Sequence, residues 1–429
     1  MRLTIPEPRI KLYEDGFAEH DKLSREATGD NLSELVERID DPLVIALDGE
    51  WGSGKSFFLK CWVGEHLKRE ENTTQTVYFD AFKHDFLDDP LIALTGVIAD
   101  RFDEADDKKA QKAWNKAKHV APALGRAVIR AGVSVVTAGL VTKADELAEA
   151  AINTASVELD GAVAGFWKRE NGKRAAMEGF RQALIDLTEP DKDGVPARKL
   201  VIVVDELDRC RPDYALSLLE IVKHFFNVGG VHFVLGVNLE QLQNSVKARY
   251  GSGTEADAYL QKFYSIKLNL PRKIQYTQDY VQYFDFASGQ LKLPPEIHGI
   301  TRDLLERYLG SAPMTPRTIQ RILTVLALIP LRSIRETPYE FLVVPAMLKI
   351  CAPTIYEKMR NNELTLENLL LIFKIDVEKI DGWVSALNAA GQHHQEYFGS
   401  TGRPIPDNFL ASICEDYLEV FDTRSLEVE

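Results

Sequence analysis

The chain has few cysteines, and none of them lie close together in sequence. The four are Cys61, Cys210, Cys351 and Cys414, without the CxxC spacing that is typical of zinc sites and redox motifs. Isolated cysteines of this kind are usually buried, reduced thiols in a cytoplasmic protein. The sequence therefore favours neither a zinc module nor a disulfide-stabilised secreted domain.

A continuous apolar run of about 18 residues, the length that suggests a membrane-spanning helix, is also lacking. Residues 121–141 come nearest, but Arg126 and Arg130 interrupt them, and acidic residues interrupt a second Ala-rich stretch at 147–167. We expect a pair of packed helices here, with peripheral contact to a membrane surface or a partner protein as the alternative. The N-terminus lacks the apolar core of a signal peptide, so we expect a cytoplasmic location.

Basic charge is in short supply. The formal net charge is −14, while the hydrophobic fraction of 45% and charged fraction of 27% are ordinary for a folded, soluble chain. A surface of this net charge repels nucleic acid as a whole. Direct binding of DNA or RNA is therefore disfavoured.

Apolar, β-branched runs alternate with helical patterns in the first two thirds of the chain. Such alternation predicts βαβ units and a parallel sheet covered on both faces. After Pro271 the strand signal disappears and helical periodicity continues to about residue 420. We expect strands at residues 43–48, 76–80, 199–204, 231–237 and 264–270.

Three regions follow from this pattern. Residues 1–42 form an N-terminal segment, which ends in a helix at 31–39 with Asp30 as its N-cap. Residues 43–271 form an α/β core with a helical insertion at about 100–188. Residues 272–429 form an α-helical C-terminal domain.

The first chemical motif is a glycine-rich loop between the first strand and the following helix. Gly49–Ser56 reads GEWGSGKS and matches the phosphate-binding pattern GxxxxGK[ST] in the expected strand–loop–helix context. Glycines let backbone N–H groups converge on phosphate oxygens, and the helix N-terminus adds positive potential. We expect this P-loop to bind ATP through Gly49, Glu50, Trp51, Gly52, Ser53, Gly54, Lys55, Ser56 and Phe57.

Individual roles follow from the chemistry of these side chains. Lys55 is expected to neutralise the β- and γ-phosphates, and the Ser56 hydroxyl to ligate Mg²⁺. Trp51 is unusual in a phosphate loop. We expect it to pack beneath the loop rather than face a partner.

A second motif ends a buried strand in two carboxylates. The apolar residues 201–204 are followed by Asp205 and Glu206, and the carboxyl end of a parallel strand is where open α/β sheets bind ligands. We expect Asp205 to hold Mg²⁺, directly or through water, and Glu206 to polarise the attacking water as a general base. Together with the P-loop, this pair predicts hydrolysis as well as binding.

Further polar residues are candidates for contacts with the reacting phosphate. Asn238 ends the next strand, so it could hydrogen-bond the γ-phosphate or the water, or it could cap the following helix, and the two roles are compatible. Single arginines are more often solvated surface residues. The candidates to contact developing charge are Arg209, Arg211, Arg249, Arg317 and Arg321.

Taken together, these motifs resemble those of the KAP family of P-loop NTPases. The resemblance covers residues 15–330 and is carried by WGSGKS, FDAFKHDFLDDPLIAL (79–94), VIVVDELDRCRPDYALSLLEIVKHFF (201–226), AYLQKFYSIKLNLP (258–271) and TPRTIQRIL (315–323). The DELDRC continuation, with Asp208 and Arg209, is more specific to this family than the two nucleotide motifs.

The resemblance implies a three-layer αβα core with an additional strand, related to the AAA+ and STAND ATPases. It also implies a nucleotide-dependent switch or assembly module, acting as a homo-oligomer or on a partner effector protein, and bacterial members are linked to exclusion of phage. Many members insert transmembrane helices between the two nucleotide motifs, whereas the charges at 121–167 favour a soluble version here. Glu206 and Asn238 depart from the family, in which Asp is frequent at both positions.

We therefore expect an ATPase with Lys55, Glu206, Asn238, Arg249 and Arg317 as its catalytic residues. Arg249 would act toward a neighbouring subunit, as in a related ATPase. Three alternatives stay open: a nucleotide-binding scaffold that hardly turns over, a membrane-associated signalling ATPase, and an ATPase stimulated by nucleic acid.

Overall fold

A five-stranded sheet forms the centre of the core. The computed structural model describes residues 8–104, 159–270, 277–309, 314–329 and 340–363, apart from isolated positions within these ranges. All neighbouring strands of the sheet are parallel, in the order β2-β3-β4-β1-β5. The strands are β1 (Leu43–Asp48), β2 (Thr74–Asp80), β3 (Lys199–Asp205), β4 (Val231–Val237) and β5 (Ile266–Asn269).

This topology confirms the parallel α/β sheet and its additional strand. β1, which leads into the P-loop, does not pair with β3, which ends in the acid pair, because β4 lies between them. Every residue of β3 and β4 is buried, as expected for central parallel strands covered on both faces. The carboxyl ends of all three strands therefore lie at one edge of the sheet.

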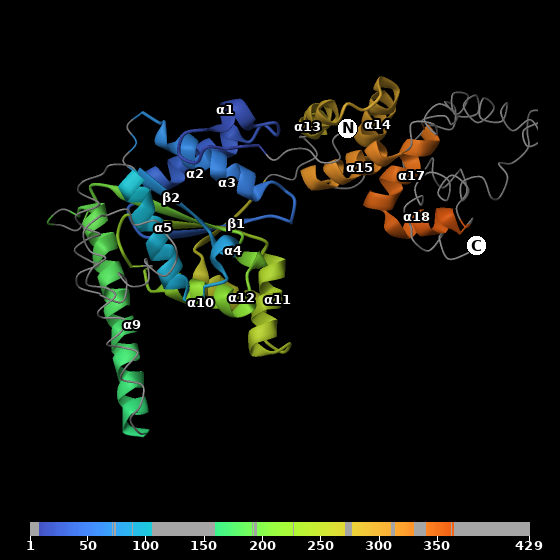
Figure 1. Ribbon diagram of the computed structural model, residues 1–429. Coiled ribbons are helices and arrows are strands. Elements are labelled where there is room, and N and C mark those ends of the chain that lie inside the picture. Colours follow the sequence, from blue (N-terminus) through green and yellow to red (C-terminus); the bar gives the residue numbers. More distant parts are fainter. Residues whose placement is uncertain are drawn as a thin grey trace, which may run out of the picture.

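Helices cover the two faces of the sheet, giving three layers (Figure 1). Alternate strand side chains pack into two apolar clusters, one on each side. One face is covered by α2 (Glu26–Arg38) and α3 (Lys55–Leu67). The other face is covered by α5 (Pro90–Glu104), α9 (Leu159–Thr188) and α10 (Pro212–Lys223).

Shorter elements complete the connections of the core. They are α1 (Phe17–His20), α4 (Ala81–His84), the 3₁₀ turns η2 (Leu207–Arg209) and η3 (Gln261–Phe263), α11 (Leu239–Tyr250) and α12 (Ala256–Leu260).

The start of α2 differs from the expectation. The helix begins at Glu26 with Arg25 as its N-cap, so the prediction of Asp30 as N-cap was wrong, and Asp30 instead pairs with Arg69 at 2.9 Å. Gly29 lies within the helix, where an added Cβ would come within 2.5 Å of the Phe17 ring. This close packing overrides the weak intrinsic helix propensity of glycine.

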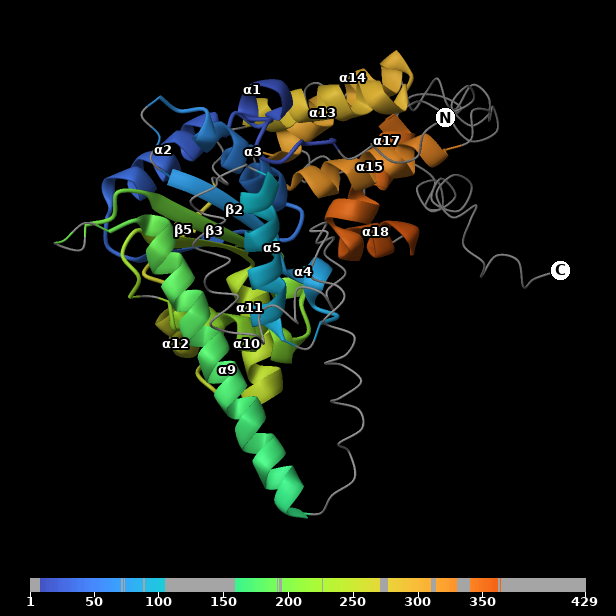
Figure 2. The same cartoon turned by 60° about the vertical axis from the view of Figure 1, so that its left-hand side comes forward.

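The expected insertion at about 100–188 is described at its two ends. α5 extends to Glu104, and α9 is a single helix of 30 residues that extends well beyond the sheet (Figure 2). The rest of the insertion, residues 105–158, lies outside the described residues, and so does most of the Ala-rich pair. Among the helices that the structure does describe, none combines the length and the apolar character needed to cross a bilayer.

The C-terminal region is helical throughout its described part and has its own apolar core. Buried side chains such as Phe284, Leu305, Leu323 and Met347 form a cluster separate from those of the sheet. The expected helical character is therefore confirmed as far as residue 360, and residues 364–429 lie outside the described part. The helices are α13 (Thr277–Leu291), α14 (Pro295–Leu309), α15 (Pro316–Leu328), α17 (Glu340–Cys351) and α18 (Pro353–Arg360).

Candidate functional site

The glycine-rich loop joins β1 to α3 and has the backbone geometry of a phosphate cradle. Gly52 and Gly54 adopt φ values of +81° and +88°, which residues with a Cβ rarely adopt. Gly54 is also the N-cap of α3, so the free N–H groups of the first helical turn open toward the loop. The loop is anchored to the neighbouring strand where the Gly49 N–H donates to the Val237 carbonyl at 3.1 Å.

Lys55 fills the centre of this loop. Its side chain is buried, and its Nζ donates to the carbonyl oxygens of Gly49 at 2.6 Å and Glu50 at 3.2 Å. Burial lowers the pKa of Lys55, while the charges of nearby carboxylates, led by Asp208, oppose that effect. Lys55 therefore adds a positive charge to a loop whose other phosphate-binding groups are backbone N–H groups.

The acid pair lies across β4 from the loop. Asp205 is 0% exposed, and burial raises the pKa of its carboxyl to about 6. Glu206 adopts φ +60°, an uncommon conformation for a residue with a side chain. Its carboxylate accepts the Ser56 hydroxyl at 2.5 Å and pairs with Arg209 Nε at 2.5 Å. The structure therefore brings the P-loop and the acid pair into direct contact.

The oxygen donors at this point fit a small, hard cation. The Ser56 hydroxyl donates to Glu206, and Ser56 lies close enough to Asp205 to lower the pKa of that carboxyl, against the larger effect of burial. No cluster of three or more His, Cys, Asp or Glu side chains suited to a metal occurs in the described part of the chain. Mg²⁺ typically takes only one or two protein carboxylates and completes its shell with water and substrate phosphates, so this donor set fits.

Asn238 caps α11, which confirms one of the two roles expected for it. Its side-chain Oδ1 accepts the Gln241 N–H at 3.3 Å at the start of α11. The residue is buried at the end of β4, beside Asp48, which accepts the Leu239 N–H at 2.9 Å. A contact with phosphate or water stays a prediction.

Of the two arginines one turn apart on α15, only one adjoins the P-loop. A Cβ added to Gly52 would lie 2.5 Å from the Arg317 Cβ, whereas Arg321 lies close enough to Cys351 of α17 to influence its thiol. Thr315 caps α15 by accepting the Thr318 N–H at 3.1 Å. The C-terminal helices therefore present Arg317, at the N-terminus of α15, to the phosphate loop.

The other candidate arginines have structural partners. Arg249 is exposed at the far end of α11 and pairs with Asp213 of α10. That end lies about 17 Å along the helix from Asn238, at 1.5 Å per residue. Arg209 is the partner of Glu206, and Arg211 bonds the backbone of residues 85–87.

Trp51 does not pack beneath the loop, so that expectation was wrong. The side chain is 45% exposed, and its indole N–H donates to the carboxylate of Asp208 in η2. An indole has a polar edge that needs a partner when its ring covers a surface, and only the fold brings Asp208 within reach. The contact ties the tip of the P-loop to the segment after the acid pair.

Arg25 was missed by sequence reasoning. It is 5% exposed, its Nη1 has no hydrogen-bond partner, and this atom lies 3.0 Å from the position of a Cβ on Gly54. Burial lowers the pKa of Arg25, and Tyr280 of α13 is the foremost group opposing that effect. A buried guanidinium nitrogen beside the P-loop, without a partner in the described part of the chain, is a donor for an anion. No motif in the sequence marks it.

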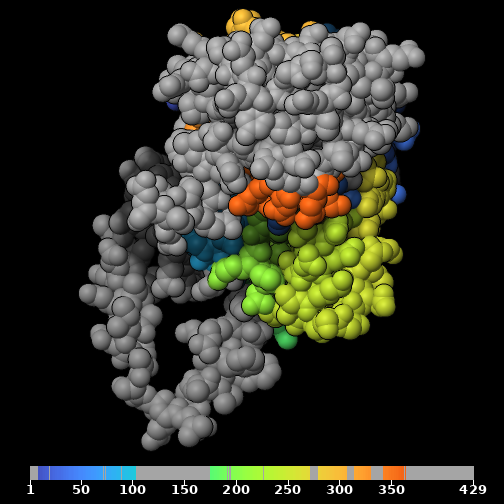
Figure 3. Space-filling view, turned by 90° about the vertical axis from the view of Figure 1, so that its right-hand side faces the viewer, coloured from blue at the N-terminus to red at the C-terminus, as the bar shows by residue number. Residues whose placement is uncertain are grey.

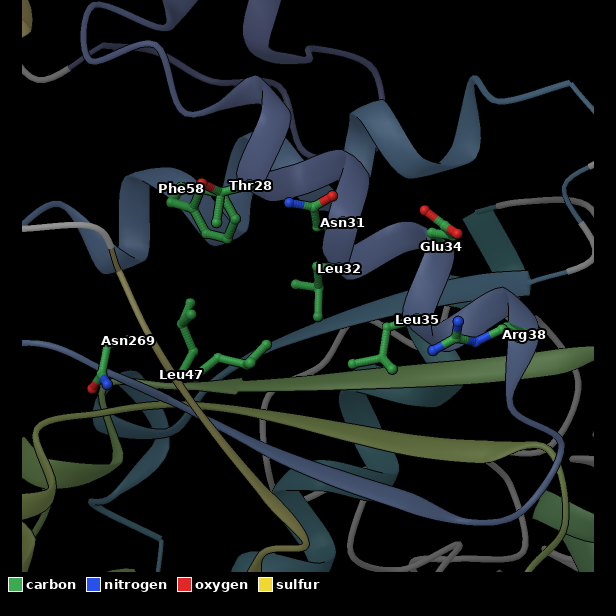
Figure 4. Close-up of a pocket in the computed structure, with 10 residues that line it drawn as sticks. Thr28, Asn31, Leu32, Glu34, Leu35, Arg38, Leu47, Phe58 and Asn269 are labelled. Carbon is green, nitrogen blue, oxygen red and sulfur yellow. The ribbon is translucent and has the colours of Figure 1, made fainter. Parts of the chain in front are cut away.

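A groove of about 330 Å³ opens beside the loop, between α2 and the strands β1 and β5 (Figure 4). Thr28 and Phe58, at one end, lie one helical turn beyond Arg25 and Gly54, so this end adjoins the P-loop. Leucines and Phe58 give the groove apolar walls, Thr28, Asn31 and Asn269 add hydroxyl and amide groups, and Glu34 and Arg38 lie at the other end. Such a mixed lining suits the nucleoside part of a nucleotide.

A family model agrees with the P-loop at this site. A family model described as the KAP family P-loop domain matches residues 25–331. Among solved structures, the chain is similar to the Aeropyrum pernix ORC2 protein in its ADPNP–ADP complexes, at 11% identity and a TM-score of 0.36, over 92% of this chain and 93% of that one. It is also similar to Drosophila ORC bound to DNA, at 14% identity and a TM-score of 0.37, over 92% and 95%. Likenesses at such TM-scores carry no conclusion about function, and no curated protein matches the chain.

The packing of Asp205 against β4 gives a first prediction. Gly236 pairs in register with Asp205 and Leu47, and a Cβ there would lie 2.6 Å from Asp205 Oδ1 and 2.5 Å from Leu59 Cδ1. We expect Gly236→Ala to lower the free energy of unfolding by about 1–3 kcal/mol, as overpacking does. Urea denaturation measures the change.

The matched control is Gly253→Ala, where an added Cβ meets nothing within 4 Å. Equal stability of the two variants would contradict the packing described for Asp205.

Proposed function

Because this chain belongs to the KAP family of P-loop NTPases, we propose that it binds and hydrolyses ATP with Mg²⁺ and that its nucleotide state switches an assembly or a partner protein. The observation that carries the proposal is the 2.5 Å hydrogen bond between Ser56 of the P-loop and Glu206 of the acid pair. The two motifs lie 150 residues apart in the chain. They meet only in a fold that uses both at one site.

Phosphate binding is assigned to the loop and its cations. Backbone N–H groups at residues 52–57 would hold the phosphate oxygens, and Lys55 would exchange the carbonyls of Gly49 and Glu50 for the β- and γ-phosphates. Arg25, with an unpartnered Nη1 beside Gly54, adds a second positive group. Lys55 would exchange neutral carbonyl acceptors for charged phosphate oxygens, and Arg25 Nη1 would gain an acceptor that it lacks in the described part of the chain.

Hydrolysis is assigned to the acid pair. Ser56 and Asp205 would hold Mg²⁺, which neutralises charge on the phosphates when bound. Glu206 would then lose the Ser56 hydroxyl as a partner and be free to accept a proton from the attacking water. Arg209, now paired with Glu206, would hold this carboxylate in place. Asn238, at the end of β4, would orient the water.

The two halves of the nucleotide would lie on opposite sides of β1. The acid pair stands on the side of β4 and β3, so the γ-phosphate would face that way. The nucleoside would extend toward β5, where the groove between α2 and the sheet adjoins the P-loop (Figure 4). The sheet order itself therefore supports this orientation.

A switch requires that some mobile part respond to the γ-phosphate. Arg317 is supplied by the C-terminal helices and sits against Gly52, while Arg25 contacts α13 through Tyr280. Both contacts join the P-loop to the region after residue 271, which we propose as a separate helical domain from 272–429, following the N-terminal segment 1–42 and the core 43–271. A role in antiphage defence, acting through a homo-oligomer or an effector, rests on the relation to bacterial members of the family.

The general-base assignment is tested by Glu206→Gln. We expect phosphate release to fall by about 10²- to 10⁴-fold, because the amide cannot accept the proton, while the affinity for a fluorescent ATP analogue changes little. Glu240→Gln, an exposed glutamate on α11, is the matched control. Unchanged phosphate release in Glu206→Gln would favour a non-hydrolysing scaffold.

Comparison of the two arginines of α15 tests the link to the C-terminal helices. We expect Arg317→Ala to reduce turnover by about 10²- to 10³-fold, in line with loss of a donor to developing charge. Arg321→Ala should reduce it much less, because this side chain lies toward Cys351 rather than the loop. Steady-state phosphate release measures both variants, and equal losses would argue against the assignment.

Assembly is tested by mass photometry with and without a slowly hydrolysed ATP analogue. The α11–α12 region forms part of the exposed surface on the side shown in Figure 3. The Arg249 side chain, at the end of α11, is 45% exposed, which supports a role for it toward a neighbouring subunit. We expect ATP-dependent growth in mass, and reduced turnover of the assembled Arg249→Ala chain. A mass that stays monomeric with the analogue would indicate a stand-alone switch.

A further inference from the structure

Tyr78 of β2 lies next to the acid pair although no motif includes it. Its hydroxyl donates to Asp205 Oδ2 at 2.6 Å, and both side chains are buried. The other carboxylate oxygen, Oδ1, accepts the Glu206 N–H at 2.9 Å. Each oxygen of Asp205 thus has one fixed donor, which sets the rotation of the carboxylate and leaves further lone pairs for another ligand.

The sheet determines that Tyr78 reaches this position. β2 and β3 pair in register, with Tyr78 opposite Val203 and Asp80 opposite Asp205. Tyr78 and Asp205 therefore project on the same face, two positions apart, and the length of a phenol spans that gap. A shorter side chain at this position would leave the buried carboxylate without this donor.

Tyr78 is itself held from several sides. The ammonium of Lys60, on α3, lies 5.7 Å from the centroid of its ring, and its backbone N–H donates to the Tyr13 hydroxyl at 3.0 Å. Arg101 of α5 stacks over the Tyr13 ring at 3.9 Å and donates to the Thr76 carbonyl at 3.1 Å. Tyr13 and Arg101 thus satisfy backbone groups on the outer edge of β2, which is the last of the described strands on that side of the sheet.

We infer that Tyr78 is a positioning residue that holds the Asp205 carboxylate in the orientation in which it serves a divalent cation. The inference rests on the proposed function, in which Asp205 and Ser56 hold Mg²⁺. The Tyr78 hydroxyl donates to Asp205, so Tyr78 would act on the cation through that carboxylate. Outer partners of this kind orient a metal-binding carboxylate and tune how well it binds.

The hydroxyl also satisfies a buried acceptor. Asp205 is 0% exposed, and Oδ2 accepts the Tyr78 hydroxyl in place of water. The position of Tyr78 in the sheet, rather than its proximity to the P-loop, gives it this role.

Tyr78→Phe tests the inference, because it removes the hydroxyl and keeps the ring. The measurement is the Mg²⁺ concentration needed for half-maximal binding of a slowly hydrolysed fluorescent ATP analogue. We expect this concentration to rise about 10- to 100-fold, the usual effect of removing an outer partner of a metal ligand. Binding of the analogue in the presence of a chelator should be unchanged, which a general loss of structure would not allow.

Tyr214→Phe is the matched control. It also removes a buried tyrosine hydroxyl, and that hydroxyl has no hydrogen-bond partner. Its Mg²⁺ requirement should equal that of the wild type. Tyr13→Phe, which frees the Tyr78 N–H rather than its hydroxyl, should shift the requirement in the same direction by a smaller factor.

The outcomes separate the inference from the proposed function. If Tyr78→Phe needs the same Mg²⁺ concentration as the wild type within twofold, the role of Tyr78 is overturned and the proposed function is not. A Tyr78→Phe chain that also loses its metal-free affinity or fails to fold shows a structural role and overturns it as well. Wild-type protein that binds the analogue equally with Mg²⁺ and with chelator overturns the metal site itself, and with it both proposals.

Discussion

The insertion of β4 between β1 and β3 is the constraint on which the site depends. It separates the strand that carries the P-loop from the strand that carries the acid pair by one strand spacing, about 5 Å on either side. That gap leaves room for Ser56 and Glu206 to meet above the end of β4, and Gly236 provides space for the Asp205 carboxylate. A larger residue at 236 would fill the space in which the two motifs come together.

Around this point the fold concentrates opposite charges in little-exposed surroundings. Lys55 and Arg25 are buried cations, and Asp205 and Asp208 are buried acids. Removing charges from water is costly unless they are paired and hydrogen-bonded. Lys55 therefore bonds loop carbonyls, and Trp51 bonds Asp208. The Nη1 of Arg25 has no such partner in the described part of the chain, and it is a donor that the phosphate of the proposed nucleotide would meet.

The C-terminal helices contact the candidate site directly. α15 begins against Gly52, and Ser24, next to Arg25, donates to Asp279 of α13 at 2.8 Å. These helices also have an apolar core of their own. A group with its own core that touches the phosphate loop through a few polar residues can move as a unit when those residues change partners. This division of packing gives the proposed switch a physical basis.

The sequence by itself determined the strands, the P-loop and the acid pair, because each depends on local pattern: apolar runs, glycines at fixed spacing, and carboxylates after a buried strand. It also identified the family, because the P-loop and DELDRC are each a short, unbroken stretch of sequence. The sequence placed the start of α2 too late. Gly29 lies inside this helix because it packs against Phe17, and its low helix propensity does not predict that. Only the tertiary structure decided that Arg317 rather than Arg321 adjoins Gly52, that Trp51 turns outward to Asp208, that Arg25 lies beside Gly54 and that Tyr78 bonds Asp205. These are contacts between residues far apart in the chain, and they follow from strand order and helix docking, which a single sequence does not encode in any local pattern.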